Sequence, residues 1–139
     1  MSYLLDTNVV SESEQSRPNP LVMDWLGARD ETNVYLSAMT IGEIRRGIEM
    51  LDSGKKKTHL RNWLDGIRAT FSGRILPIAE STFEVWGRLF AGFEKQGLKR
   101  SLFDSLLEAT ALEHDLILVT RNVRNFRDTS ITILNPWDK

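Results

Sequence analysis

The chain contains no cysteine and only two histidines, His59 and His114, among its 139 residues. Without cysteine there can be no disulfide bond, no thiolate metal site and no cysteine nucleophile. The two histidines lie far apart and lack the spacing of a metal-binding pair. Oxygen ligands would therefore have to hold any metal ion, and such ligands favour Mg²⁺ or Mn²⁺ over Zn²⁺.

Long apolar runs and a strong excess of one charge are also missing. No apolar run approaches the ~20 residues that cross a bilayer, and no basic segment followed by an apolar one opens the chain as in a secretory signal. We therefore expect a cytoplasmic protein that does not contact the membrane. The formal net charge is −1, so the total charge shows no general attraction to nucleic acid.

What remains is an ordinary globular composition, 41% hydrophobic and 27% charged, in a length that suits one domain spanning residues 1–139. Short apolar segments alternate with segments of helical periodicity. We expect strands at 3–5, 34–36, 75–76, 116–119 and 131–134, and helices at 21–28, 41–51, 58–71, 81–95 and 102–114. This alternation predicts an α/β fold with a mainly parallel sheet of about five short strands flanked by helices.

The first predicted strand runs directly into Asp6, Thr7 and Asn8. Open α/β sheets bind ligands at the carboxyl ends of their strands, and carboxylates gathered there suit a hard divalent cation. Asp is also a favoured N-cap, so Asp6 could simply begin the next helix. From the residues alone, both interpretations stay open.

Two further acids, Glu43 and Asp104, each stand three residues after a hydroxyl residue, Thr40 or Ser101. This spacing is that of a capping box, and each cap would contribute about 1 kcal/mol. The acids also have apolar neighbours, and a carboxylate there costs free energy unless it is paired or bound to a metal. Three helix N-termini, positive in partial charge, could hold all three acids near one cation.

Basic residues occur in short clusters, and three arginines are candidates for binding phosphate: Arg45, Arg121 and Arg124. Arg45 follows Glu43 on the same predicted helix, and the other two lie just after the fourth predicted strand. The alternative is that they form salt bridges with local acids. The charge pattern does not decide between these roles.

Four ordered segments carry a resemblance to a known family. They are LLDTNVVSE from Leu4, YLSAMTIGEIRRGI from Tyr35, FDSLLEATA from Phe103 and LVTRNVRNF from Leu118, with Asn135-Pro136-Trp137 near the end. Together they extend over nearly the whole chain. The chain resembles PIN-domain toxins of the VapC type, close to the FitB-like branch.

This resemblance implies a PIN-like α/β/α sandwich and a Mg²⁺- or Mn²⁺-dependent endoribonuclease that serves as the toxin of a type II toxin–antitoxin system. Asp6, Glu43 and Asp104 match the metal-binding and catalytic acids of the family. Thr7, Asn8 and Thr120 match polar residues that line the site.

The chain departs from the family pattern after Thr120. Many relatives carry a fourth acid there, whereas this chain has Asn122 and Asn125 as the site-lining candidates. An amide can ligate through its oxygen but cannot neutralise charge or act as a base. A degenerate PIN domain that binds RNA or an antitoxin with weak or no cleavage is therefore the alternative.

The resemblance also implies partners: an RNA substrate, a cognate VapB-type antitoxin, a second copy in a homodimer, and operator DNA only through the antitoxin. The predicted helix at 81–95 carries an apolar stripe of Val85, Trp86, Leu89, Phe90 and Phe93. Such a stripe belongs to the core or to a protein interface rather than to a base-stacking platform.

Overall fold

The structure, a computed structural model, describes residues 1–138 and confirms the α/β fold. Five parallel strands form one sheet in the order β3-β2-β1-β4-β5. The strands are β1 (Tyr3–Leu5), β2 (Val34–Ser37), β3 (Ile75–Leu76), β4 (Ile117–Val119) and β5 (Ile133–Leu134). The α-helices are α1 (Thr7–Val10), α2 (Pro20–Gly27), α3 (Ala38–Glu49), α4 (Lys55–Thr70), α5 (Glu80–Lys95) and α6 (Leu102–Glu113).

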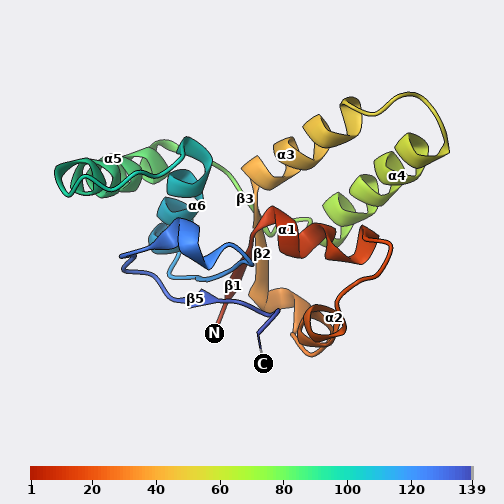
Figure 1. Ribbon diagram of the computed structural model, residues 1–139, viewed down its shortest axis with the longest axis horizontal. Helices are drawn as coiled ribbons and strands as arrows, with labels where there is room; N and C mark the ends of the chain where they lie inside the picture. The colour runs from red at the N-terminus through yellow and green to blue at the C-terminus, as the bar shows by residue number, and fades with distance from the viewer. Residues whose placement is uncertain (139) are drawn as a thin grey trace.

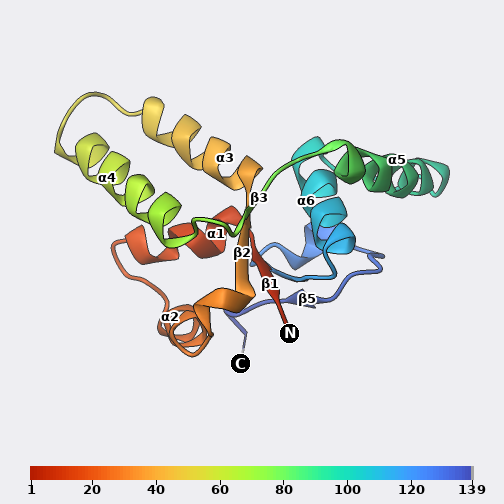
Figure 2. The same cartoon turned by 180° about the vertical axis from the view of Figure 1, so that it is seen from behind.

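Helices cover both faces of the sheet. Helices α2, α3 and α4 lie on one side and α5 and α6 on the other, as the two opposite views agree (Figures 1 and 2). Alternation along the strands explains this, because successive side chains point to opposite faces. Tyr3 and Leu5 belong to the core beneath α2, α3 and α4, whereas Leu4 packs with Leu107 of α6.

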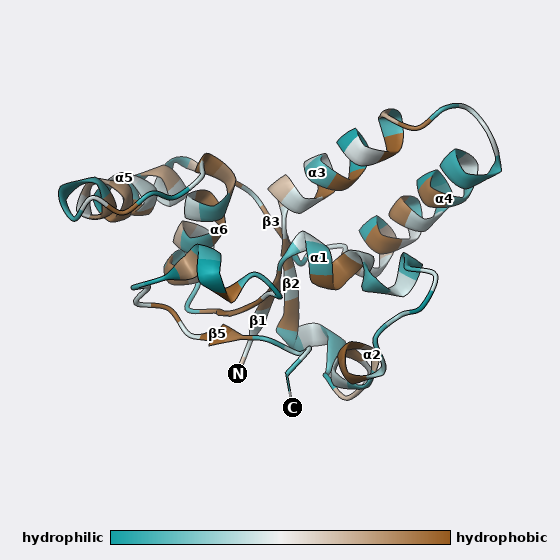
Figure 3. Cartoon of the chain, in the orientation of Figure 1, coloured by the Kyte–Doolittle hydropathy of each residue, from teal (hydrophilic) through white to brown (hydrophobic). Residues whose placement is uncertain are grey.

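The two layers are built differently. Helices α3 and α4 form an antiparallel arm that extends away from the sheet (Figure 1). In Figure 3, hydrophobic residues recur between hydrophilic ones along α4, as expected of an amphipathic helix. Helix α5 packs mainly against α6, where the indole of Trp86 donates a hydrogen bond to Ser105 Oγ at 2.9 Å. No helix within residues 1–138 is long and apolar enough to span a membrane.

The start of α3 corrects one prediction. The helix begins at Ala38, with the Ser37 hydroxyl accepting the N–H of Met39 at 3.1 Å, so Thr40 is not its cap. Ala and Met are good helix formers and extend the helix back to the end of β2. Glu43 consequently lies in the second turn, away from the positive helix end, and the capping role predicted for it is wrong.

The sequence pattern did not predict the shortest elements. Helix α1 and the 3₁₀ turns η1 (Ser11–Glu14), η2 (Glu31–Asn33) and η3 (Val123–Phe126) contain only three or four residues each. Such segments are too short for periodicity to develop. Two of them, α1 and η3, follow the strands that lead into the predicted site.

The strand order places the site. The chain runs from β1 outward through β2 and β3, then returns to β4 on the other side of β1. The connections diverge at the carboxyl ends of β1 and β4, which is the topological switch point where open α/β sheets bind ligands. Asp6 follows β1 and Thr120 follows β4.

Candidate active site

Asp6 is both a helix cap and the centre of a hydrogen-bond network. Its Oδ1 accepts the N–H of Thr7 at 2.7 Å, and its Oδ2 accepts the hydroxyl of Thr120 at 2.8 Å. The side-chain amide of Asn8 lies 3.5 Å from the same Oδ2. The two interpretations of Asp6 from sequence are thus compatible, because capping leaves the carboxylate at the switch point.

Glu43 reaches the same place from α3. Its Oε1 accepts the hydroxyl of Thr7 at 2.9 Å, which ties the second turn of α3 to the start of α1. Thr7 therefore holds Asp6 through its backbone and Glu43 through its side chain. One residue positions two acids that are 37 positions apart.

Asp104 lies in the first turn of α6 and is half-buried. Its backbone N–H donates to the hydroxyl of Ser101 at 3.1 Å, which is one half of the predicted capping box. The return bond, from the N–H of Ser101 to the Asp104 carboxylate, is not formed among residues 1–138, so the capping role predicted for this acid is wrong. Among residues 1–138, no hydrogen bond to the Asp104 carboxylate is found. That carboxylate is therefore free to interact with a ligand.

The acids also influence one another electrostatically. Burial raises the pKa of Asp6, and the charge of Asp104 raises it further, against the lowering effect of the Thr120 and Thr7 hydrogen bonds. Burial likewise raises the pKa of Glu43, with additional contributions from Asp6 and Asp104. Asp6 and Glu43 thus stand in the repulsive field of neighbouring carboxylates, a state that a bound cation would relieve.

The donor set fits a hard divalent metal. Three carboxylates, with hydroxyl and amide groups beside them, offer the oxygen ligands that Mg²⁺ and Mn²⁺ prefer. Within residues 1–138 no three acidic or histidine side chains stand close enough to enclose an ion as they are. The fit therefore rests on ligand chemistry and on mutual repulsion.

The remaining site-lining candidates separate into two groups. Thr7, Asn8 and Thr120 are joined to the acids, and the N–H of Asn122 donates to Thr120 Oγ1 at 3.0 Å. Asn125 lies on η3 with an exposed side chain, and its N–H donates to the carbonyl of Asn122. Asn122 thus borders the network, whereas Asn125 lies farther along the same turn.

The three candidate phosphate-binding arginines also differ. Arg45 forms an exposed salt bridge with Glu49 at 3.7 Å, so the alternative role holds for it. Arg121 donates its backbone N–H to Asn8 Oδ1 at 3.3 Å, and its guanidinium lies 5.3 Å from the ring centre of Trp137. Arg124 is exposed on η3. Neither Arg121 nor Arg124 forms a salt bridge with an acid in the described part of the chain.

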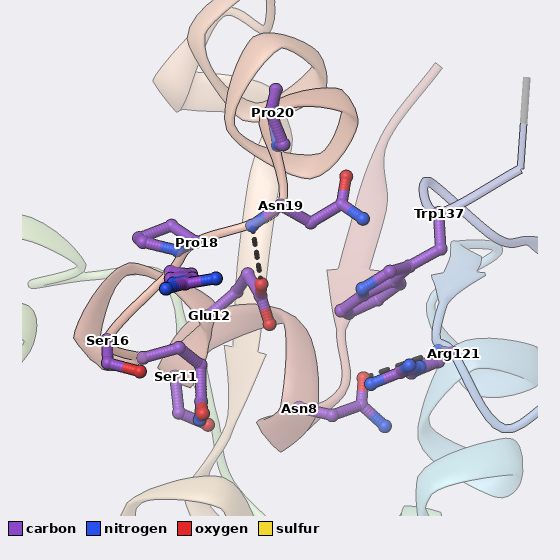
Figure 4. A pocket seen from close by; sticks show the side chains of 11 residues that line it. Asn8, Ser11, Glu12, Ser16, Pro18, Asn19, Pro20, Arg121 and Trp137 are labelled. Atoms are coloured by element: carbon purple, nitrogen blue, oxygen red, sulfur yellow. Dashed lines mark hydrogen bonds between the residues drawn. The ribbon is translucent and has the colours of Figure 1, made fainter.

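A pocket of about 790 Å³ lies next to Asp6, separated from it by Asn8, and contains residues that were not predicted to belong to the site. Glu12, Arg17 and Trp137 line it together with Asn8 and Arg121 (Figure 4). Trp137 and Glu12 both belong to the family segments, but neither was assigned to the site, and an acid in a polar segment looks like a surface residue. Its burial comes from the fold of η1.

A buried ion pair on the α6 side was also missed. Arg100 Nε lies 3.0 Å from Glu108 Oε1, and their side chains are 3% and 0% exposed. Glu108 also accepts the Thr129 hydroxyl, and Arg100 donates to the carbonyl of Arg127. This cluster fixes the segment after η3 to α6, and therefore supports the edge of the site from behind.

Comparison with known proteins agrees with this geometry. The sequence profile of the PIN domain matches residues 3–131. The chain belongs to the PIN domain family. Toxin FitB of Neisseria gonorrhoeae is 37% identical over 135 residues, covering 96% of this chain and 97% of that protein. VapC ribonuclease Y4jK of Sinorhizobium fredii is 32% identical over 136 residues, covering 97% of each.

Solved structures show the same PIN fold. The crystal structure of FitAcB from Neisseria gonorrhoeae superposes with a TM-score of 0.93 at 36% identity, covering 99% of both chains. The structure of FitAB bound to an IR36 DNA fragment gives a TM-score of 0.94 at 35% identity, covering 99% of this chain and 96% of that one. The PIN-like sandwich expected from the sequence is thus confirmed.

Proposed function

We propose that this PIN domain is the ribonuclease toxin of a toxin–antitoxin pair and cleaves RNA with the help of Mg²⁺ or Mn²⁺. The observation that carries the proposal is the hydrogen-bond network at the switch point of the sheet, in which Thr7 bonds both Asp6 and Glu43. The charge of Asp104, which raises the pKa of both acids, supports it. The relatives named toxin FitB and VapC ribonuclease support the same activity.

Asp6, Glu43 and Asp104 would hold the ion. When bound, it supplies charge compensation at the phosphate and makes a water molecule more acidic. Thr7 keeps Asp6 and Glu43 oriented toward one point, and Thr120 fixes the rotamer of Asp6. These contacts limit the movement of the acids, which is what positioning contributes to catalysis.

Asp104 is our candidate for the group that accepts a proton from the attacking water. Its carboxylate has no hydrogen-bond donor among residues 1–138, whereas Asp6 and Glu43 already accept threonine hydroxyls. Proton transfer to a positioned carboxylate is ordinary general-base catalysis. Attack by water predicts products with 5′-phosphate and 3′-hydroxyl ends.

We further propose a VapB-type antitoxin as partner, because two of the similar structures are FitAB and FitAcB complexes. Contact with operator DNA would then pass through the antitoxin. A homodimer remains our prediction. Exposed Phe83 on α5 and exposed Leu102 and Phe103 on α6 offer an apolar surface for it.

The test is RNA cleavage by purified wild-type protein, Asp6→Asn and Glu43→Gln, with and without Mg²⁺ or Mn²⁺. We expect both variants to lose metal-dependent cleavage and to relieve growth arrest on expression, while circular dichroism shows an unchanged fold. Wild-type rates in folded variants would show that the site is assigned to the wrong residues.

Asn122 favours a second candidate, a PIN domain that binds RNA without cutting it. It borders the network through its backbone where many relatives have an acid, and it adds no negative charge. Titration of metal into a mixture of protein and labelled RNA separates the two candidates. Binding with no product at any metal concentration would support the second.

A further inference from the structure

The pocket lined by Asn8 lies next to the candidate active site. Asn8 forms part of its wall and connects the two, since its side-chain amide lies 3.5 Å from Asp6 Oδ2 and its Oδ1 accepts the N–H of Arg121. Figure 4 shows the pocket between the loop at Pro18 and Asn19 on one side and Trp137 and Arg121 on the other. A volume of about 790 Å³ is ample for one nucleotide.

Glu12 supplies an open acceptor inside this pocket. The residue is 8% exposed, and its Oε2 accepts the N–H of Asn19 at 2.7 Å. Oε1 of Glu12 forms no hydrogen bond. Because every fully buried side-chain oxygen in the described residues has a hydrogen-bond partner, Oε1 must be accessible to solvent. No arginine, lysine or histidine of residues 1–138 forms a salt bridge with Glu12. A ligand with N–H donors would complete it.

Arg121 and Trp137 form the opposite wall. The guanidinium of Arg121 lies 5.3 Å from the centre of the indole, and the backbone N–H of Trp137 donates to Asn135 Oδ1 at 2.9 Å. The ring thus holds the cation on the side of the pocket nearest Asn8 and the acids. A guanidinium binds phosphate oxygens in pairs, and an aromatic ring offers contact area to a base.

We propose that this pocket receives one unpaired guanine nucleotide of the RNA, next to the cleaved bond. Arg121 binds its phosphate, Trp137 contacts its base, and Oε1 of Glu12 accepts hydrogen bonds from the base edge. The proposal rests on the ribonuclease function proposed above. Unpaired bases are read through their Watson–Crick edges. Guanine presents two adjacent donors there, N1–H and the N2 amino group, whereas adenine and cytosine place an acceptor beside their donor.

The geometry favours RNA over a peptide as the occupant. Arg121, whose guanidinium suits phosphate, lies beside Asn8 on the side of the pocket toward Asp6, whereas the Glu12 carboxylate is held by Asn19 of the opposite wall. Arg17 also lines the pocket. This arrangement follows the order of groups in a nucleotide.

The test uses short single-stranded RNAs that differ at one position, which carries guanine, inosine or adenine. Inosine lacks only the N2 amino group. We expect wild-type protein to cleave the guanine RNA with a kcat/KM at least about fivefold above the inosine RNA, because unpaired buried polar groups penalise the poorer ligand. Glu12→Gln should lose this preference, since its amide turns a donor toward the donors of guanine, while its remaining oxygen still accepts from Asn19.

Glu14→Gln is the matched control. It removes the same charge from the same 3₁₀ turn, but Glu14 pairs with His59 and does not line this pocket. We expect it to keep the guanine preference. Equal rates on all three RNAs in wild-type protein, or an unchanged preference in Glu12→Gln, would overturn the proposal, and the former is also what a peptide-binding pocket would give.

Failure of the proposed ribonuclease function can be distinguished from failure of the guanine pocket. If wild-type protein cleaves none of the RNAs, the ribonuclease assignment fails, and fluorescence anisotropy of the same labelled RNAs tests the pocket independently. Tighter binding of the guanine RNA, lost in Glu12→Gln, supports the pocket. Equal binding of all three overturns it.

Discussion

Thr120 donates its hydroxyl to Oδ2 of Asp6 at 2.8 Å, across 114 positions of sequence. The bond exists because β1 and β4 are neighbours in register, with Leu5 opposite Val119, so that the residues after each strand emerge side by side. Asp6 is therefore held by a neighbouring strand as well as by its own helix.

Thr120→Val should reduce RNA cleavage about tenfold or more, because Asp6 loses the donor that fixes its rotamer and small misplacements are costly in catalysis. The shape of the side chain is preserved, so the fold should persist. Thr120→Ser restores the hydroxyl and should recover most of the activity. Steady-state kinetics on one RNA substrate checks this, and full activity in Thr120→Val would show that the bond is dispensable.

Asp6→Asn should stabilise the metal-free protein at neutral pH. The raised pKa values of Asp6 and Glu43 mean that the folded state takes up protons more readily than the unfolded state. Their contribution is thus most favourable below the ordinary values of 3.8 and 4.5, and it is lost as the pH rises through the folded-state pKa values. Thermal unfolding from pH 4 to 7 should show the advantage of Asp6→Asn growing with pH.

Bound metal should make the wild-type protein more stable than Asp6→Asn. A ligand that binds only the folded state at 100 times its Kd adds about 2.7 kcal/mol. Added Mg²⁺ or Mn²⁺ should therefore raise the Tm of wild-type protein and have little effect on Asp6→Asn. An equal rise in both proteins would mean that the ions bind elsewhere.

Asn122→Asp should increase metal affinity and metal-dependent cleavage. The residue borders the network through its bond to Thr120, and the change adds a charge that the amide cannot supply. Asn125→Asp is the comparison, because Asn125 lies farther along η3. Calorimetric titration with Mn²⁺ measures the effect, and a greater gain from Asn125→Asp would reassign the position of the missing acid.

Arg100→Met should cost about 3–5 kcal/mol of unfolding free energy, because it leaves Glu108 charged and buried without its partner. Replacing both residues by methionine should recover much of the loss. The exposed pair Arg88 and Glu84 is the control, and Arg88→Met should cost under about 1 kcal/mol. Chemical denaturation measures all four proteins, and similar losses for the two arginines would contradict the role given to burial.

Arg121→Ala together with Arg124→Ala should weaken RNA binding and flatten its dependence on salt, since each phosphate contact releases counterions. Arg45→Ala should change the slope less, because Arg45 already pairs with Glu49. Binding measured across a salt series checks this. An unchanged slope in the double variant would remove both arginines from the RNA surface.

The sequence by itself determined the alternation of strands and helices and named the three acids. Periodicity suffices for long amphipathic helices such as α5 and for buried strands such as β1, because both are dictated by which residues must leave water. The bounds of β1 and β3 agree with the prediction, and the family motifs identified Asp6, Glu43 and Asp104.

Only the tertiary structure decided how these residues act together. Local signals predicted a capping role for Glu43, whereas the N-cap of α3 is Ser37. They could not show that Thr7 bonds Glu43 or that Thr120 bonds Asp6. Nor could they show that Glu12 is buried beside an open pocket or that Arg100 reaches Glu108. These relationships depend on strand order and on short turns, which bring distant residues together and leave no periodic trace in the chain.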